Sequence, residues 1–242
     1  MPNIRQTLFT ACLLVPIACS SMATQPPEIN PEHPLLGMLQ AQPAPASLSA
    51  TTLLSLRWAF PLALKKNTDE VKNVESCDAL LDATLDGFGP SKPSEQGLIQ
   101  ANVALCQATA ESQNLEASSR SFLPNPLLGP NFPEIAPAEL AIAISNSDQK
   151  RNKQSSTWQE FSGAMDYQSA GPFEATYTTE DGAIQRVFLL GTGDINDDGI
   201  RDAILYLESA LTTGSYSAAR YLIITRNDDD GPMRVLENGF TE

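Results

Sequence analysis

In the first half of the chain, apolar residues recur at the three- and four-residue spacing of helices. One series predicts a helix over residues 67–87, and a second predicts a helix over residues 94–110. An earlier apolar stretch, residues 52–66, predicts a short helix broken at Pro61, because proline cannot continue a helix. The first half of the chain is therefore expected to be mainly helical.

Two cysteines lie on the apolar faces of the two longer predicted helices, Cys77 on the first and Cys106 on the second. If residues 87–93 form a tight connection, the helices run antiparallel and the two cysteines stand at about the same height. The spacing therefore predicts a disulfide between Cys77 and Cys106. A redox-active pair is the alternative, but it usually has C-x-x-C spacing.

The middle of the chain carries five prolines between residues 121 and 137 and is expected to be an irregular crossover. A further helix is expected from Pro137 to about Ile144, before the basic run at residues 150–153. Ser147 and Lys150 match the S-x-x-K motif of penicillin-recognising enzymes, but neither S-D-N nor K-T-G is present. We interpret the match as chance.

From about residue 154 the pattern changes to short apolar runs bounded by turn residues, which predicts strands. The expected strands are residues 173–178, 183–190, 203–209, 216–226 and 233–237. Consecutive strands joined by tight turns predict an antiparallel meander of about five strands.

Connectivity also predicts where the turns lie. In an up-and-down meander, alternate connections fall at the same end, so the acidic loop at residues 194–202 and the acidic turn at residues 228–230 should share one rim. The fold class expected is α+β, with a disulfide-stapled helical half packed on a C-terminal antiparallel β-meander. Its globular domain should span residues 51–242, with residues 51–153 mainly helical and residues 154–242 mainly β.

The start of the chain has the pattern of an export signal. Residues 8–18 are apolar but too short to span a bilayer, which predicts a signal peptide over residues 1–18. The sequence before Cys19 resembles a lipobox, and that resemblance implies that Cys19 is lipidated. Because Ser20 is not the Asp that retains lipoproteins in the inner membrane, the resemblance further implies the periplasmic face of the outer membrane. Ordinary cleavage after residues 21–23, giving a soluble periplasmic or secreted protein, remains the alternative.

Residues 19–50 are rich in proline, alanine, serine and glutamine, and are expected to form a tether between the lipid anchor and the domain. The single histidine, His33, lies in this tether, so a Ser-His or Cys-His catalytic arrangement and a multi-histidine zinc site are both excluded.

The chain is strongly acidic, with 29 Asp and Glu against 15 Lys and Arg and a net charge of −14. Such a surface repels phosphate backbones, so no nucleic-acid partner is expected.

The acidic loop between two predicted strands has the spacing of a calcium loop. Oxygen ligands are expected at positions one, three, five, seven and nine, and a glycine at position six takes the turn. The residues at these ligand positions are Asp194, Asn196, Asp198, Ile200 through its carbonyl, and Asp202, with Gly199 at position six. Position twelve is Leu205 in place of the bidentate Glu of an EF-hand, so a true EF-hand is disfavoured.

This D-x-N-x-D-G-x-x-D run resembles the calcium loops of FG-GAP repeats, and the segment from Gly193 to about Arg226 resembles part of uncharacterised Gram-negative envelope proteins. The resemblance implies calcium as the ligand. A single copy does not imply a propeller, which needs repeated blades. The alternative is a metal-free turn, because Asp and Asn side chains also bond their own backbone.

Two functions remain open at this stage. The first is an exported, lipid-anchored envelope module that binds an envelope protein or a glycan and has a calcium-stabilised acidic loop. The second is a periplasmic hydrolase that uses carboxylates such as Asp194 or Glu174. Solvated turn carboxylates make poor general acids, which favours the binding module and assigns no catalytic residue.

Overall fold

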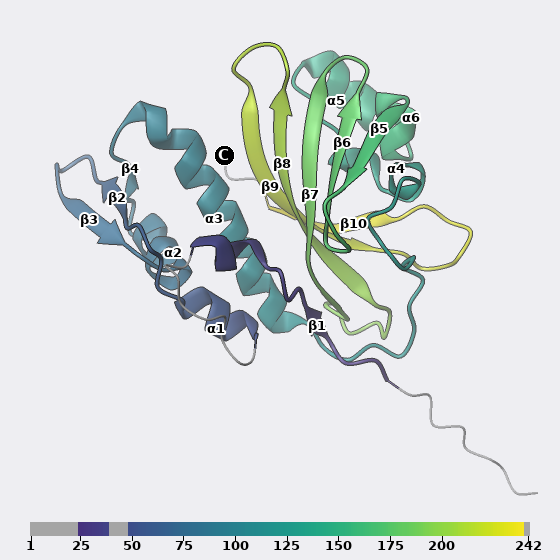
Figure 1. Cartoon of the computed structure of the whole chain (residues 1–242), viewed down its shortest axis with the longest axis horizontal. Helices are drawn as coiled ribbons and strands as arrows, with labels where there is room; N and C mark the ends of the chain where they lie inside the picture. The colour runs from purple at the N-terminus through teal and green to yellow at the C-terminus, as the bar shows by residue number, and fades with distance from the viewer. Residues whose placement is uncertain (1–23, 39–47, 240–242) are drawn as a thin grey trace, which may run out of the picture.

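The largest element of the fold is a seven-stranded antiparallel sheet formed mainly by the C-terminal part of the chain (Figure 1). The structure is a computed structural model that describes residues 24–38 and 48–239. Strands β5 to β10 neighbour one another in chain order, and β1 pairs with β7. The strands are β1 (Glu28–Ile29), β5 (Met165–Ser169), β6 (Glu174–Thr179), β7 (Ala183–Gly193), β8 (Asp202–Leu211), β9 (Ser217–Thr225) and β10 (Arg234–Gly239).

The expected meander is confirmed, with β5 as an additional strand. The residues of β5 are mostly polar and exposed, so no apolar run marks this strand in the sequence. The strand order also confirms that the β7–β8 loop and the β9–β10 connection lie at the same end of the sheet. We call this end the acidic rim.

The apolar run of β8 is continuous because both faces of the sheet are covered. Ala203, Leu205 and Leu207 belong to one core cluster, and Ile204 and Tyr206 belong to the other. Successive side chains of a strand point to opposite faces, so a strand buried on both faces has no polar alternation.

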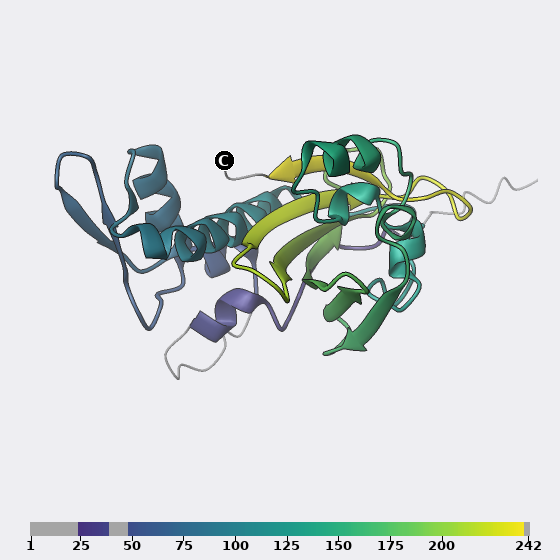
Figure 2. The same ribbon diagram turned by 90° about the horizontal axis from the view of Figure 1, so that it is seen from above.

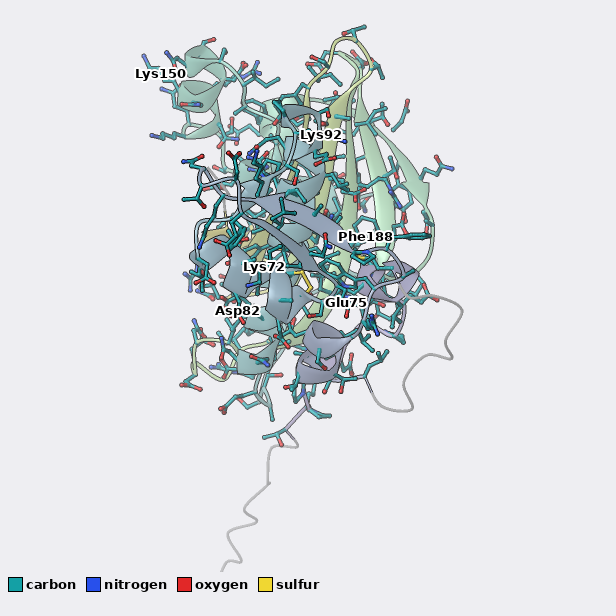
Figure 3. The ribbon with its side chains drawn as sticks, turned by 90° about the vertical axis from the view of Figure 1, so that its left-hand side faces the viewer. Lys72, Glu75, Asp82, Lys92, Lys150 and Phe188 are labelled. Atoms are coloured by element: carbon teal, nitrogen blue, oxygen red, sulfur yellow. A yellow bond between two sulfur atoms is a disulfide. The ribbon has the colours of Figure 1, made fainter. Side chains whose placement is uncertain are left out.

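The first face of the sheet is covered by the helical half of the molecule (Figures 1 and 2). The long helix α3 packs against β8 and β9, and α1, α2 and a small sheet of order β3-β2-β4 lie beyond it. Figure 3 looks onto this outer layer, where Lys72, Glu75 and Asp82 are labelled. The elements are α1 (Ala50–Ser55), β2 (Leu62–Lys65), β3 (Val71–Val74), α2 (Cys77–Leu85), β4 (Gly89–Pro90) and α3 (Gln96–Glu111), with the 3-10 turns Pro34–Met38, Pro93–Glu95 and Ser112–Asn114.

The predicted disulfide is confirmed. Cys77 begins α2, Cys106 lies in α3, and the sulfur atoms are bonded with a Cα–Cα distance of 5.2 Å. Both residues are fully buried. The α+β class with a disulfide-stapled helical half is therefore correct.

Two of the predicted helices in this half were wrong in extent. The segment 52–66 is helical only in α1 and then enters strand β2. The segment 67–87 begins as the turn and second strand of a β2–β3 hairpin, and α2 starts only at Cys77, where the Ser76 side chain caps the helix. The positive φ of 64° at Asp69 makes the hairpin turn, which a helix could not contain.

The second face of the sheet is covered by the irregular crossover, which begins directly after the Ser112–Asn114 turn, and by the short helices α4 (Phe132–Ile135) and α6 (Trp158–Ser162). A third short helix, α5 (Asn146–Asn152), has no buried residue and packs beside α6, where Arg151 lies over the Phe161 ring. The aromatic rings of Phe132, Trp158 and Tyr177 pack together in the core on this second face, with centroids 5.0 to 6.3 Å apart. The predicted helix from Pro137 to Ile144 was wrong, because only a 3-10 turn at Ala138–Leu140 forms. Helix α5 instead begins after Ser145, which forms a capping box with Asp148.

The tether prediction was wrong for residues 24–38, because these residues fold onto the domain. Glu28 and Ile29 pair with the end of β7, and Leu35 and His33 are buried. The His33 ring accepts the backbone N–H of Leu35 and lies 3.4 Å from the Thr109 hydroxyl of α3. Burial lowers the pKa of His33 to about 4, so it is neutral at pH 7. The signal peptide and Cys19 lie outside the described residues.

Candidate functional site: the acidic rim

The candidate calcium loop joins β7 to β8, with Asp194 directly after β7 and Asp202 at the start of β8. Gly193 allows the crossover to approach this point, because a Cβ there would lie 2.8 Å from the Glu116 carbonyl oxygen. Glu116 and Asp194 form a backbone bridge, with N–O distances of 2.8 and 3.0 Å. The loop is therefore held from outside by the crossover as well as by the two strands.

Asp194 organises the loop through its side chain although it is almost fully buried. One carboxylate oxygen accepts the N–H of Gly199 at 2.6 Å, and the other accepts the N–H groups of Asn196 and Asp198 at 3.3 and 3.2 Å. Asp198 in turn accepts the N–H of Ile200 at 2.8 Å. These are the internal bonds of an Asx-rich turn.

The turn also has the expected backbone conformation at position six of the loop. Gly199 has a φ of 77°, in the left-handed region where glycine is favoured, and Asp197 has a φ of 61°. The Gly199 carbonyl accepts hydrogen bonds from the N–H groups of Ser119 and Arg120 at 2.9 and 3.1 Å. The carbonyl of Ile200, the predicted ligand at position seven, accepts no hydrogen bond within the described part of the chain.

Asp202 is the most unusual residue of the loop because it is an acid with no exposed surface. One carboxylate oxygen accepts the N–H of Ile195 at 3.0 Å, while the other is buried without a hydrogen-bond partner. The Thr225 hydroxyl lies beside it and lowers its pKa, but the contact falls short of hydrogen-bond geometry. Burial dominates and raises the pKa of Asp202 to about 6, with smaller contributions from Asp198 and Asp194.

The structure brings the predicted loop residues Asp194, Asn196, Asp198, Ile200 and Asp202 into one turn, but their side chains are not arranged as a closed ligand cage. Within residues 24–38 and 48–239, no three His, Cys, Asp or Glu side chains come together as a metal-binding group. The candidate ligand atoms of the loop are all oxygens, which are hard ligands that suit Ca²⁺. Carboxylate oxygens that already accept one N–H keep a further lone pair for an ion.

Arg201, to which the sequence analysis gave no role, connects the loop to the N-terminal strand. It is 6% exposed, and its guanidinium donates to the Thr192 hydroxyl and the Pro26 carbonyl, both at 3.0 Å. It also pairs with Glu28 at 3.3 Å. No local pattern could have indicated this role, because the partners are more than 170 residues away along the chain for Pro26 and Glu28.

The acids considered for hydrolysis have other contacts. Glu174 lies on β6 and pairs with Arg186 of β7 at 2.7 Å. Arg186 also pairs with Glu208 of β8 at 3.0 Å, which makes a cross-strand charge ladder. Asp194 is fixed by backbone N–H groups. The structure does not bring Asp194 and Glu174 together as an acid–base pair, because Glu174 pairs with Phe188 of β7, well before the loop.

Comparison of the chain with protein-family models, with curated proteins and with solved structures finds no match. Among the helices of the described residues, none is long and apolar enough to cross a membrane.

Proposed function

We propose that the protein is a binding module of the cell envelope, lipid-anchored through Cys19 at the periplasmic face of the outer membrane, whose acidic rim is stabilised by a weakly bound calcium ion. The ligands of the calcium ion would be the carboxylates of Asp194, Asp198 and Asp202, the amide of Asn196 and the carbonyl of Ile200. The partner of the protein would be an envelope protein or a glycan.

The observation that carries the calcium proposal is the buried oxygen of Asp202 that has no hydrogen-bond partner. The other oxygen accepts the Ile195 N–H, but a buried carboxylate oxygen without a hydrogen bond is costly, and a nearby cation is one way in which proteins offset that cost. The Ile200 carbonyl also accepts no hydrogen bond in the described chain, so its oxygen is a second candidate ligand atom without another role in the loop.

The envelope location has one structural support. The Cys77–Cys106 disulfide is fully buried and bridges two core helices. Structural disulfides persist in oxidising compartments such as the bacterial periplasm and are rare in the reducing cytosol. The lipid anchor rests on the sequence around Cys19 alone.

A binding role is favoured over hydrolysis by the contacts of the candidate acids. Glu174 is held in an ion pair, and both oxygens of Asp194 accept backbone N–H groups. A general acid or base needs access to substrate within hydrogen-bond reach. We therefore do not assign a reaction.

Thermal unfolding with added calcium tests the proposal. An ion that binds only the folded state stabilises it by RT ln(1 + [L]/Kd), so calcium should raise the melting temperature of the full chain. The missing Glu at position twelve predicts a weak Kd of roughly 10⁻⁴ to 10⁻³ M. Magnesium should have a smaller effect, because it keeps its water and demands octahedral geometry.

Variants assign the effect to the loop. Asp198→Asn removes one charge but keeps an oxygen that can accept the Ile200 N–H, and it should abolish the calcium shift. The matched control is Asp229→Asn in the neighbouring acidic turn, because the Asp229 side chain makes no hydrogen bond or ion pair with another described residue. A wild-type melting temperature that does not respond to millimolar calcium would favour the metal-free turn.

A further inference from the structure

Among the described residues, the outer edge of β9 is bare, that is, without a partner strand, at the end of the sheet opposite the acidic loop. β10 pairs with β9 only as far as Gly239, which lies opposite Tyr221. Residues 217–220 of β9 pair with β8 on one side. On the other side no strand of the described chain pairs with them.

The backbone groups of this edge point outward in a known order. The Tyr216 carbonyl accepts the N–H of Leu211, so Tyr216 faces β8. Residues of an antiparallel strand alternate in the side to which their backbone groups point. Ser217 and Ala219 therefore direct their N–H and C=O groups away from β8, and Tyr221 directs its groups toward β10.

Two adjoining cavities border this bare edge. One, of about 470 Å³, lies between α3 and the segment that includes α5, and the other, of about 300 Å³, lies over the sheet face beside the start of α3. Gln100, Ser209, Ala218 and Ala219 line both cavities. The two alanines are small, so they leave room beside the strand on both faces of the sheet. Together the cavities form what we call the β9 groove.

The β9 groove is cationic on one wall, although the protein is acidic. Lys153, at the end of α5, and Arg220 line the larger cavity together with one acid, Glu139. Arg220 is fixed there, because its guanidinium donates to the carbonyls of Glu139 and Ala141 at 2.6 and 3.1 Å. Lys153 is exposed and forms no ion pair with another described residue.

We propose that the β9 groove binds an extended peptide segment that carries an acidic side chain and adds as a strand beside residues 217–220. The outward backbone groups of Ser217 and Ala219 would pair with the peptide main chain, as in recognition by strand addition. Lys153 and Arg220 would attract the acidic side chain. This inference depends on the proposed function only in treating the protein as a binding module, and it does not require calcium.

Fluorescence anisotropy of two labelled synthetic peptides tests the proposal with the full chain. One peptide alternates valine with glutamate, and the other alternates valine with lysine. The glutamate peptide should bind saturably and the lysine peptide should not. The binding should be the same with calcium and with chelator, so a failed calcium test and a failed peptide test are distinguishable.

Matched variants locate the site. Lys153→Glu should weaken binding of the glutamate peptide about tenfold, because an attraction between exposed charges becomes a repulsion. Lys150→Glu makes the same charge change on the same helix but at a position that does not line the groove, and it should change the affinity little (Figure 3). Ala219→Pro removes an outward N–H and should abolish binding, provided that its melting curve shows a folded protein.

Several results would overturn the proposal. They are failure of the glutamate peptide to bind, equal binding of the two peptides, equal losses in Lys153→Glu and Lys150→Glu, and full binding by folded Ala219→Pro. The proposal would also be wrong if the peptide bound only after deletion of residues 240–242, because the chain's own end would then be the occupant of the edge.

Discussion

Breaking the Cys77–Cys106 bond should lower the free energy of unfolding by several kcal/mol. The two residues are separated by 29 positions in the chain. In the chain-entropy model, a closed loop of this size stabilises the folded state by about 3 to 4 kcal/mol at 25 °C. Because small domains are stable by only about 5 to 15 kcal/mol, the bond would carry a substantial share of the total.

Two samples distinguish the contribution of the cross-link to stability from the contribution of cysteine packing. Wild-type protein unfolded in urea with reductant keeps both sulfur atoms and loses only the bond. The Cys77→Ala/Cys106→Ala variant loses the bond and also leaves small gaps, since both positions are fully buried. We expect the reduced protein to lose about 3 to 4 kcal/mol and the variant to lose somewhat more.

A thiol assay is the control for this experiment, because the oxidised protein must contain no reactive Cys77 or Cys106 before the comparison is made. If the bond is present and its reduction changes the free energy of unfolding by less than about 1 kcal/mol, the entropic reasoning is wrong for this protein. Labelling of both cysteines in native protein without reductant would instead contradict the bond itself.

Three further predictions concern the core, the buried histidine and the anchor. Leu205→Ala, at a fully buried position of β8, should cost about 2 to 5 kcal/mol in urea unfolding, whereas Leu98→Ala, which is 55% exposed, should cost far less. The pKa of His33 is lowered to about 4 by burial, so the unfolded chain takes up a proton that the folded chain does not as the pH falls below 6.5. The His33 contribution should therefore decrease stability by up to about 1.4 kcal/mol per pH unit between 6.5 and 4. The raised pKa of Asp202 acts in the opposite direction but is common to both proteins, so the test is the difference in slope between wild type and His33→Gln. Equal slopes would contradict a buried neutral His33. Cys19→Ser should move the protein from the membrane fraction to the soluble fraction, and a wild type that is already soluble would refute the anchor.

The sequence was most informative where one hydrophobic pattern extends over many residues. Helix α3 and strands β7 to β9 have long, strongly apolar patterns that admit one interpretation. The disulfide followed from helix geometry even though the connection between the helices, which contains β4, was not foreseen. The bond required only that both cysteines lie on facing helices at similar height.

The errors arose where a short pattern fitted two structures. Val71 and Val74 are three residues apart, which suits a helix, but both lie in a strand that pairs with β2. The long-range pairing decides between the two, and no local pattern contains it. The same holds for β1, whose two residues pair with the far end of β7 and carry His33 into the core.

The residue spacing and the turn of the candidate site could be predicted from the sequence, but the burial of its side chains could not. The alternation of acids and the glycine at position six indicated the turn, and Gly199 has the expected positive φ. The complete burial of Asp202 and the crossover contacts at Glu116 and Ser119 depend on how distant segments pack. For the same reason the role of Arg201 could not be read from the sequence.

The most direct test of the calcium proposal is a titration followed by amide NMR spectra of the ¹⁵N-labelled protein. If calcium binds the acidic loop, the amide signals of residues 194–202 should shift in a saturable way with a Kd of roughly 10⁻⁴ to 10⁻³ M. Gly199 and Ile200 should be among those that shift, because their N–H groups bond the ligand carboxylates of Asp194 and Asp198. Loop signals that stay fixed at millimolar calcium, or that shift no more than those of residues 228–231, would contradict a calcium site.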